Sequence, residues 1–258
     1  MALQGVILSW SGVVADDEQL HLYAINQVLL EENLRPWDLG SPAQKELYRL
    51  HHLGQPDREG LLALWQAQGR VLSPRQQEGL LQRKALYYRQ ALQEQKGSLL
   101  VPGLAEALEK LEQLRLKVGL LSGHAAIEVE AFLERFPCPA LARLTHDFRY
   151  RVTGEAGDPQ LHRLLLERMG LSPQECLSFE ATHAGIQAAR SQGIPVLALA
   201  TFFPLHMLQR RANWAVDGYH QVEWERIQNW FAGGQDRPST PEAEAGSCKR
   251  SQGGQPQP

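Results

Sequence analysis

Short apolar runs alternate with amphipathic segments along most of this chain, and this alternation is what most limits its possible folds. Four runs are short, apolar and bounded by turn residues, as buried strands are. They are residues 5–8, 117–121, 176–179 and 195–200, with a weaker fifth at 214–216. The segments between them have the apolar spacing of helices, at 104–116, 126–135, 159–169, 184–191 and 222–231. Such alternation predicts an α/β fold with a parallel sheet covered on both faces, and ligands at the carboxyl ends of its strands.

The segment 17–96 departs from this alternation. It has helical patterns at 20–32, 42–53, 58–68 and 74–95 and no convincing strand. A block of helices inserted after the first strand predicts an all-α cap domain at 17–96, on a core formed by 1–16 and 97–233. From 234 to 258 the sequence is rich in Gly, Gln, Pro, Ser and Glu. Such a composition buries too little apolar surface to fold, which predicts a disordered tail.

Composition limits the possible partners and surroundings. The chain has 258 residues, 43% of them hydrophobic, which is enough for one core and a small accessory domain. A net charge of -3 gives no electrostatic reason to expect nucleic acid or an anionic membrane as partner. Cys138, Cys176 and Cys248 lack metal-ligand spacing, and no secretory signal pattern opens the sequence. We expect a cytoplasmic protein with reduced thiols.

The first predicted strand runs into the turn Ser9-Trp10-Ser11-Gly12. Strand, glycine-containing turn and helix entry together resemble the first motif of the haloacid dehalogenase-like hydrolases. That motif normally reads Asp-x-Asp-Gly, so the frame is kept while serines stand at both aspartate positions.

A second segment strengthens the resemblance. Residues 177–189 closely match a motif of the beta-phosphoglucomutase and phosphoglycolate phosphatase branch, with Gly185 and an alanine pair at the same spacing. The resemblance covers residues 1–233. It implies a Rossmann-like sheet with an inserted helical cap.

The resemblance also implies a chemistry. Enzymes of this family form a covalent aspartyl-phosphate: the first aspartate attacks phosphorus, the second moves a proton, and Mg²⁺ neutralises the phosphoryl oxygens. Here those two positions are Ser9 and Ser11. Neither hydroxyl is ionised near neutral pH or has an obvious activating base within its motif. We therefore do not expect Ser9 to replace the aspartate as nucleophile.

The remaining motif positions are only partly kept. Ser122 stands where a serine or threonine contacts the phosphate, and capping of the next helix is an equally good explanation for it. The family's lysine position falls on Ala156 or Glu155, and Arg151 is no equivalent replacement. In the fourth motif Glu180 remains and is followed by Ala181.

Metal binding is therefore not expected at the family's position. Glu180 alone is too little for a dedicated Mg²⁺ site. It is a residual ligand at most, and acceptance of a hydrogen bond from a neighbouring backbone amide explains it equally well.

Loss of a nucleophile, an acid/base group, a lysine and metal ligands together predicts no ordinary phosphatase turnover. The leading hypothesis is a catalytically inactive family member that acts as a binding, scaffold or regulatory protein without a cofactor. Its ligand would be an unknown protein or a small phosphorylated molecule. The candidate contacts lie in two turns: Ser9, Trp10, Ser11, Gly12, Ser122 and Gly123.

The alternative is a hydrolase or phosphatase with altered catalytic residues that acts on a small phosphorylated metabolite, with Mg²⁺ only in this case. It would use Glu180 or a cleft histidine as base, which predicts a strongly perturbed group in an enclosed pocket. His124 and His183 both follow predicted strands. Surface or helix-start positions are the ordinary explanation for both. A third hypothesis is a subunit of a larger assembly with contacts on the cap or the tail.

Overall fold

A computed structural model describes residues 2–146, 149–154 and 161–233. Within this part, one parallel sheet has the strand order β3-β2-β1-β4-β5-β6. The strands are β1 (Gly5–Ser9), β2 (Lys117–Leu121), β3 (Arg151–Val152), β4 (Cys176–Glu180), β5 (Val196–Leu199) and β6 (Trp214–Val216). The predicted α/β fold is confirmed, including the weaker strand at 214–216.

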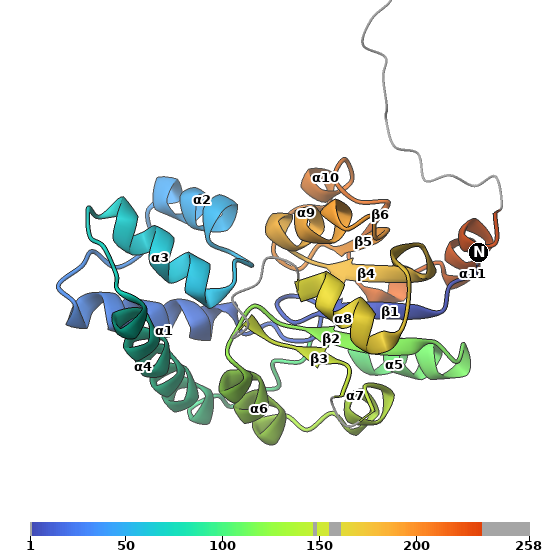
Figure 1. The fold of residues 1–258 in the computed structure, drawn as a ribbon, viewed down its shortest axis with the longest axis horizontal. Helices are drawn as coiled ribbons and strands as arrows, with labels where there is room; N and C mark the ends of the chain where they lie inside the picture. Colours follow the sequence, from blue (N-terminus) through green and yellow to red (C-terminus); the bar gives the residue numbers. More distant parts are fainter. Residues whose placement is uncertain (1, 147–148, 155–160, 234–258) are drawn as a thin grey trace, which may run out of the picture.

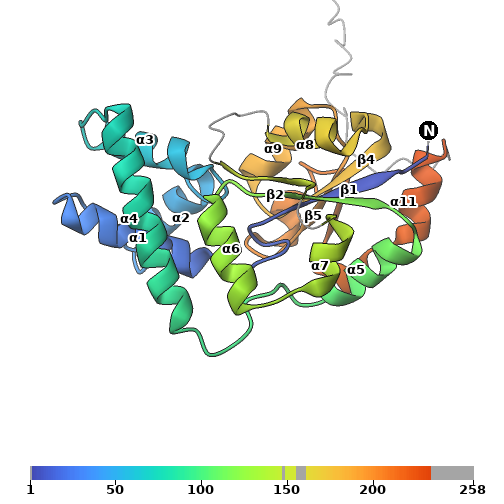
Figure 2. The same cartoon turned by 60° about the horizontal axis from the view of Figure 1, so that its bottom comes forward.

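Helices cover both faces of this sheet (Figures 1 and 2). One face carries α5 (Leu104–Gln113), α6 (Ala126–Arg135), α7 (Pro139–Leu144) and α11 (Trp224–Phe231). The other carries α8 (Leu161–Met169), α9 (His183–Ser191) and α10 (Leu205–Leu208). Alternate residues of β1 face opposite layers, because Val6 and Leu8 belong to one apolar cluster and Ile7 to the other. Burial on both faces explains why this strand is an unbroken apolar run.

Four helices lie together beyond one end of the sheet, at the left of Figure 1. They are α1 (Glu18–Glu31), α2 (Pro42–His51), α3 (Asp57–Ala67) and α4 (Pro74–Gln93). The backbone N–H of Asp57 donates to the carbonyl of Gly123, just after β2, over 2.9 Å. The four helices therefore cover the carboxyl ends of the central strands, where ligands of parallel sheets bind.

Three short elements were not predicted: β3, α7 and α10. Two to six residues are too few to establish a hydrophobic period, so their formation depends on neighbours rather than on local pattern. β3 pairs with β2 in the register Leu120↔Arg151 and Leu121↔Val152. The predicted disordered tail and Cys248 lie outside the described residues, whereas Cys138 and Cys176 are free thiols.

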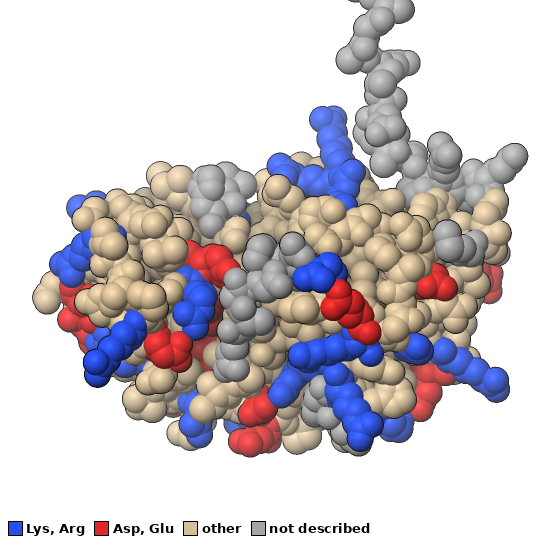
Figure 3. All heavy atoms as spheres, in the orientation of Figure 1, with Lys and Arg blue, Asp and Glu red and all other residues tan. Residues whose placement is uncertain are grey.

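The surface charges and the helix lengths can be compared with the expectations drawn from the composition. On the face shown in Figure 3, basic and acidic side chains of the described residues lie next to one another rather than in separate areas. Among the described helices, none is both long and apolar enough to cross a membrane.

Two glycines with the same backbone conformation allow a test of packing after β1. Gly12 and Gly69 both have φ of 73°. A Cβ at Gly12 would lie 2.6 Å from the Cβ of Ala181, whereas a Cβ at Gly69 would meet nothing within 4 Å. We expect Gly69→Ala to lower the free energy of unfolding by about 1–2 kcal/mol, the cost of a left-handed alanine. Gly12→Ala should cost about 1–3 kcal/mol more because of overpacking.

Urea denaturation of both variants measures this difference. Equal losses in the two variants would contradict the tight contact between the turn after β1 and Ala181.

Candidate functional site

Three side chains from separate segments form a continuous line of hydrogen bonds beyond the ends of β1 and β2. Ser11 lies in the turn after β1, His124 in the loop after β2, and Asp57 at the first residue of α3. Ser11 Oγ lies 3.0 Å from His124 Nε2, and His124 Nδ1 lies 3.1 Å from Asp57 Oδ1. His124 is buried and Ser11 is half-buried. The hydroxyl, the imidazole and the carboxylate are therefore linked by hydrogen bonds in that order.

Backbone contacts hold the two core segments of this line. In the turn after β1, the N–H groups of Val14 and Ala15 both donate to the carbonyl of Trp10 over 3.0 Å. In the loop after β2, Ser122 Oγ accepts from the backbone N–H of His124 over 3.1 Å. Ser122 thus shapes the loop that carries His124. It does not cap α6, whose N-cap residue is Ala125.

The charges around His124 define the protonation of its ring. Burial would raise the pKa of Asp57, but the charges of Lys84 and His124 hold it well below its usual range. Burial alone would lower the pKa of His124, and the charge and hydrogen bond of Asp57 more than offset this, so its pKa is raised. Because the Asp57 carboxylate can only accept, a neutral His124 carries its hydrogen on Nδ1 and directs the Nε2 lone pair at Ser11.

A buried lysine supports the carboxylate end of the line. Lys84 Nζ, from α4, lies 2.7 Å from Asp57 Oδ2, 3.1 Å from His21 Nδ1 and 3.1 Å from Glu128 Oε2. An ammonium has three hydrogens, so these three acceptors satisfy it fully. Burial raises the pKa of Glu128 above its ordinary value. Asp57 is consequently held at both oxygens, one by Lys84 and the other by His124.

His21 lies between two rings. Its ring is stacked on His124 with centroids 3.5 Å apart and on Tyr88 with centroids 4.4 Å apart. Burial and then the charges of His124 and Lys84 lower the pKa of His21 to about 3, so this imidazole is neutral. His21 Nε2 faces Asp17 Oδ2 at 3.2 Å. The flat neutral ring fixes the plane of His124.

Asp17 is the N-cap residue of α1 and is buried. Its Oδ2 accepts from Trp10 Nε1 over 3.1 Å and from Tyr88 Oη over 2.6 Å. Trp10, a candidate ligand contact, is buried and packs against Phe132.

The family's metal position does not fit Mg²⁺ in this chain. Glu180 is fully buried, and its Oε1 lies 2.8 Å from His162 Nε2 and accepts from Ser178 Oγ over 2.6 Å. Ala181 offers no ligand atom and Ser9 is a buried hydroxyl rather than a carboxylate. Side chains of β4 and α8 therefore hold Oε1 of Glu180, in place of the backbone amide of the alternative explanation.

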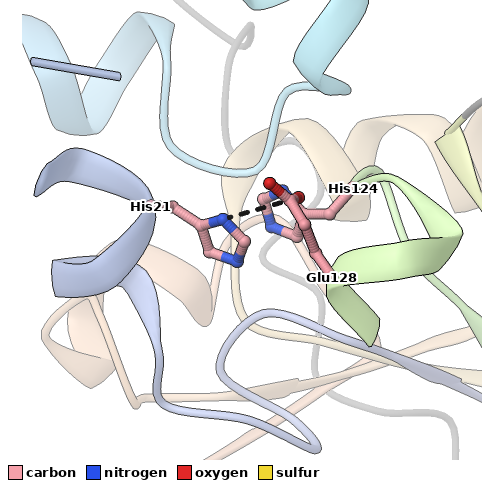
Figure 4. A group of neighbouring side chains, drawn as sticks. All are labelled: His21, His124 and Glu128. Carbon is pink, nitrogen blue, oxygen red and sulfur yellow. Dashed lines mark ion pairs between the residues drawn. The ribbon is translucent and has the colours of Figure 1, made fainter. Parts of the chain in front are cut away.

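A second group has metal-ligand chemistry. His21, His124 and Glu128 come from α1, the loop after β2 and α6, and point toward one another in Figure 4, with one ligand atom of each within 4.8 Å of the others. Lys84 Nζ already hydrogen-bonds to His21 and Glu128, while the two nitrogens of His124 face Ser11 and Asp57. A cation there would have to displace the ammonium, so we assign no metal to this group.

Other predicted site residues lie apart from this line. Arg151 pairs with Glu130 over 2.7 Å. His183 begins α9 and stacks on Phe203, as the helix-start explanation predicted. His124 lies just before the N-cap residue of α6, but it is buried, so a surface position does not explain it. Ala156 and Glu155 lie outside the described residues.

Asp57, Lys84 and Glu128 were not predicted as site residues from the sequence. One signal was available for Lys84, because it lies on the same stripe of α4 as Leu80 and Tyr88, and both of these are buried. A lysine on an apolar helix stripe needs buried partners. Asp57 had no comparable signal.

Removal of the Lys84 charge tests this network. Lys84→Met would leave the Asp57 and Glu128 carboxyls buried without a cation. We expect the free energy of unfolding to fall by about 3–5 kcal/mol. The matched change at exposed Lys45, in α2, should stay within about 0.5 kcal/mol of the unchanged protein. Denaturation curves at neutral pH measure both; equal effects would show that Lys84 is not the counter-ion of the cluster.

Comparison with known proteins identifies the family of this chain. Residues 5–193 match the family model described as haloacid dehalogenase-like hydrolase. The chain is 28% identical over 193 residues to a phosphorylated carbohydrates phosphatase of Thermotoga maritima, which covers 74% of this chain and 82% of that protein. It is 25% identical over 218 residues to protein CbbY of Cupriavidus necator, covering 78% and 80% of the two chains.

Solved structures share the fold. A beta-phosphoglucomutase from Clostridium difficile superposes with a TM-score of 0.70 at 18% identity, covering 90% of this chain and 98% of that one. A CbbY variant from Rhodobacter sphaeroides, in complex with xylulose-(1,5)bisphosphate, gives a TM-score of 0.70 at 19% identity and covers 86% and 96%. Since the family model spans most of the sequence and the same fold recurs in these structures, the chain belongs to the haloacid dehalogenase-like hydrolase family.

Proposed function

We propose that this protein is a hydrolase of a small phosphorylated metabolite in which His124 replaces an aspartate as general base. One observation carries the proposal: His124 Nε2 lies 3.0 Å from the Ser11 hydroxyl while Asp57 holds Nδ1. The hypothesis of altered catalytic residues predicts a perturbed histidine in an enclosed pocket. His124 supports this hypothesis, since it is buried, has a raised pKa and lines a cavity of about 50 Å³.

The relatives support a hydrolase over a protein that only binds. One is named a phosphorylated carbohydrates phosphatase, and a CbbY structure contains a sugar bisphosphate. Without aspartates at positions 9 and 11, an aspartyl-phosphate cannot form there, so the base must activate another hydroxyl. General base catalysis of this kind contributes about 10²–10⁴-fold to a rate.

We also propose the division into a core of residues 1–16 and 97–233 and a helical cap of residues 17–96. It is supported by the cluster of α1–α4 beyond the sheet (Figure 1). Asp57 belongs to this cap, and Ser11 and His124 belong to the core. The site is then complete only where cap and core meet.

A second candidate function is a binding or regulatory protein, which would contact a protein or a small phosphorylated ligand through the turns after β1 and β2. The occupied carboxylate of Glu180 and the loss of both motif-one aspartates favour it. A measurement of catalytic turnover distinguishes the hydrolase from the binding protein.

The first test is phosphate release from sugar phosphates and p-nitrophenyl phosphate by the full chain in EDTA. Release should persist in EDTA, because no step uses a metal, and should fall by about 100-fold or more in His124→Gln. His206→Gln, at an exposed histidine of α10, serves as the control and should leave the rate unchanged. No release from any substrate, or release that EDTA abolishes, would contradict the proposal.

The pH dependence gives a second test. The base must be neutral to accept a proton, so kcat/KM should rise with pH and reach half its plateau above pH 6.5, because the pKa of His124 is raised from 6.5. Asp57→Asn removes the charge that raises this pKa and leaves the burial that lowers it. The midpoint should therefore move to lower pH. An unchanged midpoint in Asp57→Asn would show that His124 is not the titrating group.

A further inference from the structure

The order of groups at this site is that of a nucleophile, a base and a carboxylate that orients the base. We infer that Ser11 is a covalent nucleophile and that this site hydrolyses a carboxylic ester through an acyl-serine. The inference adds a second reaction at this site and rests on the proposed function only in taking His124 as the base.

Each member of the line is held by its own contacts. The turn that carries Ser11 is fastened by Thr201 Oγ1, which donates to the carbonyl of Gly12 over 2.6 Å. His124 is fixed by its backbone bond to Ser122 and by the stacked ring of His21. Lys84 holds the second oxygen of Asp57. Independent support at each position preorganises the three groups before a substrate binds.

The reaction balances with water as the only co-reactant. Ser11 Oγ attacks the carbonyl carbon while its proton moves to His124 Nε2. The bond to the alcohol oxygen breaks, and the alcohol leaves with that proton. Water then attacks the acyl carbon and gives a proton to Nε2. The bond to Ser11 Oγ breaks, Oγ regains the proton, and the carboxylic acid leaves.

Backbone donors are available for the oxygen that becomes negative. Among the described residues, the backbone N–H groups of Ser11 and Gly123 make no turn, loop or cap hydrogen bond. One belongs to the nucleophile itself and the other to the residue before the base. Free N–H groups in such positions stabilise an oxyanion, and loss of one such donor typically costs about 10²–10³-fold in rate.

The charges around Ser11 suit a neutral carbonyl group as the centre of attack by this serine. The cluster contains the low-pKa carboxyl groups of Asp17 and Asp57. The nearby ammonium, Lys84, donates its hydrogens to acceptors of the cluster itself. A neutral ester meets no charge repulsion from these carboxylates.

An adjoining pocket suits the acyl group. A cavity of about 170 Å³ lies against the loop after β2. Most of its lining is small or apolar, including Pro56, Leu121 and Leu161, and Gln55, Glu59 and His162 also line it. Its size and lining fit a short apolar acyl chain.

A fluorophosphonate probe tests Ser11 directly in the full-length protein. The probe phosphonylates serines that an adjacent base activates, and peptide mass spectrometry locates the modified residue. We expect labelling at Ser11 in EDTA, no labelling in Ser11→Ala, and a rate at least about 100-fold lower in His124→Gln. Ser191→Ala, at an exposed serine at the end of α9, is the control variant and should label at the unchanged rate.

A second measurement needs no variant. p-Nitrophenyl acetate should give a burst of about one p-nitrophenol per chain, and an acid quench should leave an acetyl group on Ser11. An unlabelled, unacetylated Ser11 in the unchanged protein would overturn the inference, as would labelling that His124→Gln does not slow. Phosphate release that persists beside an unreactive Ser11 would preserve the proposed function alone. Acylation without phosphate release would support Ser11 as the nucleophile and contradict the proposal that the protein releases phosphate.

Discussion

The buried ammonium of Lys84 is the interaction on which the rest of the site depends. A cation out of water is tolerated only where it is paired and hydrogen-bonded. Lys84 meets this need with Asp57, Glu128 and His21, which come from α3, α6 and α1. One side chain of α4 therefore draws three other elements to a single point. The same contact leaves only one oxygen of Asp57 to face His124, and this orients the imidazole toward Ser11.

The site has been rebuilt within the family fold. The positions that normally hold a metal and form an aspartyl-phosphate carry Ser9, Ser11 and Ala181, and Glu180 is turned to His162 and Ser178. A different set of polar groups has formed at the same end of the sheet, from segments outside those motifs. Loss of the family's groups alone suggests an inert protein. The new hydrogen-bonded line supports a hydrolase with a different base.

The fold places this line between two groups of elements. The turn after β1 and the loop after β2 end next to each other because the two strands are paired neighbours in the sheet. The start of α3 is fixed beside them by the hydrogen bond from Asp57 N to the carbonyl of Gly123. Relative movement of α1–α4 and the sheet would separate Asp57 from His124. The position of α3 against the sheet therefore also determines how His124 is oriented.

The sequence by itself determined the sheet, the helices that cover it and the family, since apolar periodicity and the segment 177–189 are local patterns that packing must satisfy. It also identified Ser11 and His124 as candidates. It did not predict β3, α7 or α10, which are too short to show a period. Nor could it pair Ser11 with His124, 113 residues later in the chain, or either of them with Asp57 and Lys84. Hydrogen bonds between distant segments depend on where the folded chain brings donors and acceptors together, and no local pattern records this. Only the tertiary structure decided that a lysine, a histidine and an aspartate from separate elements form one site with Ser11.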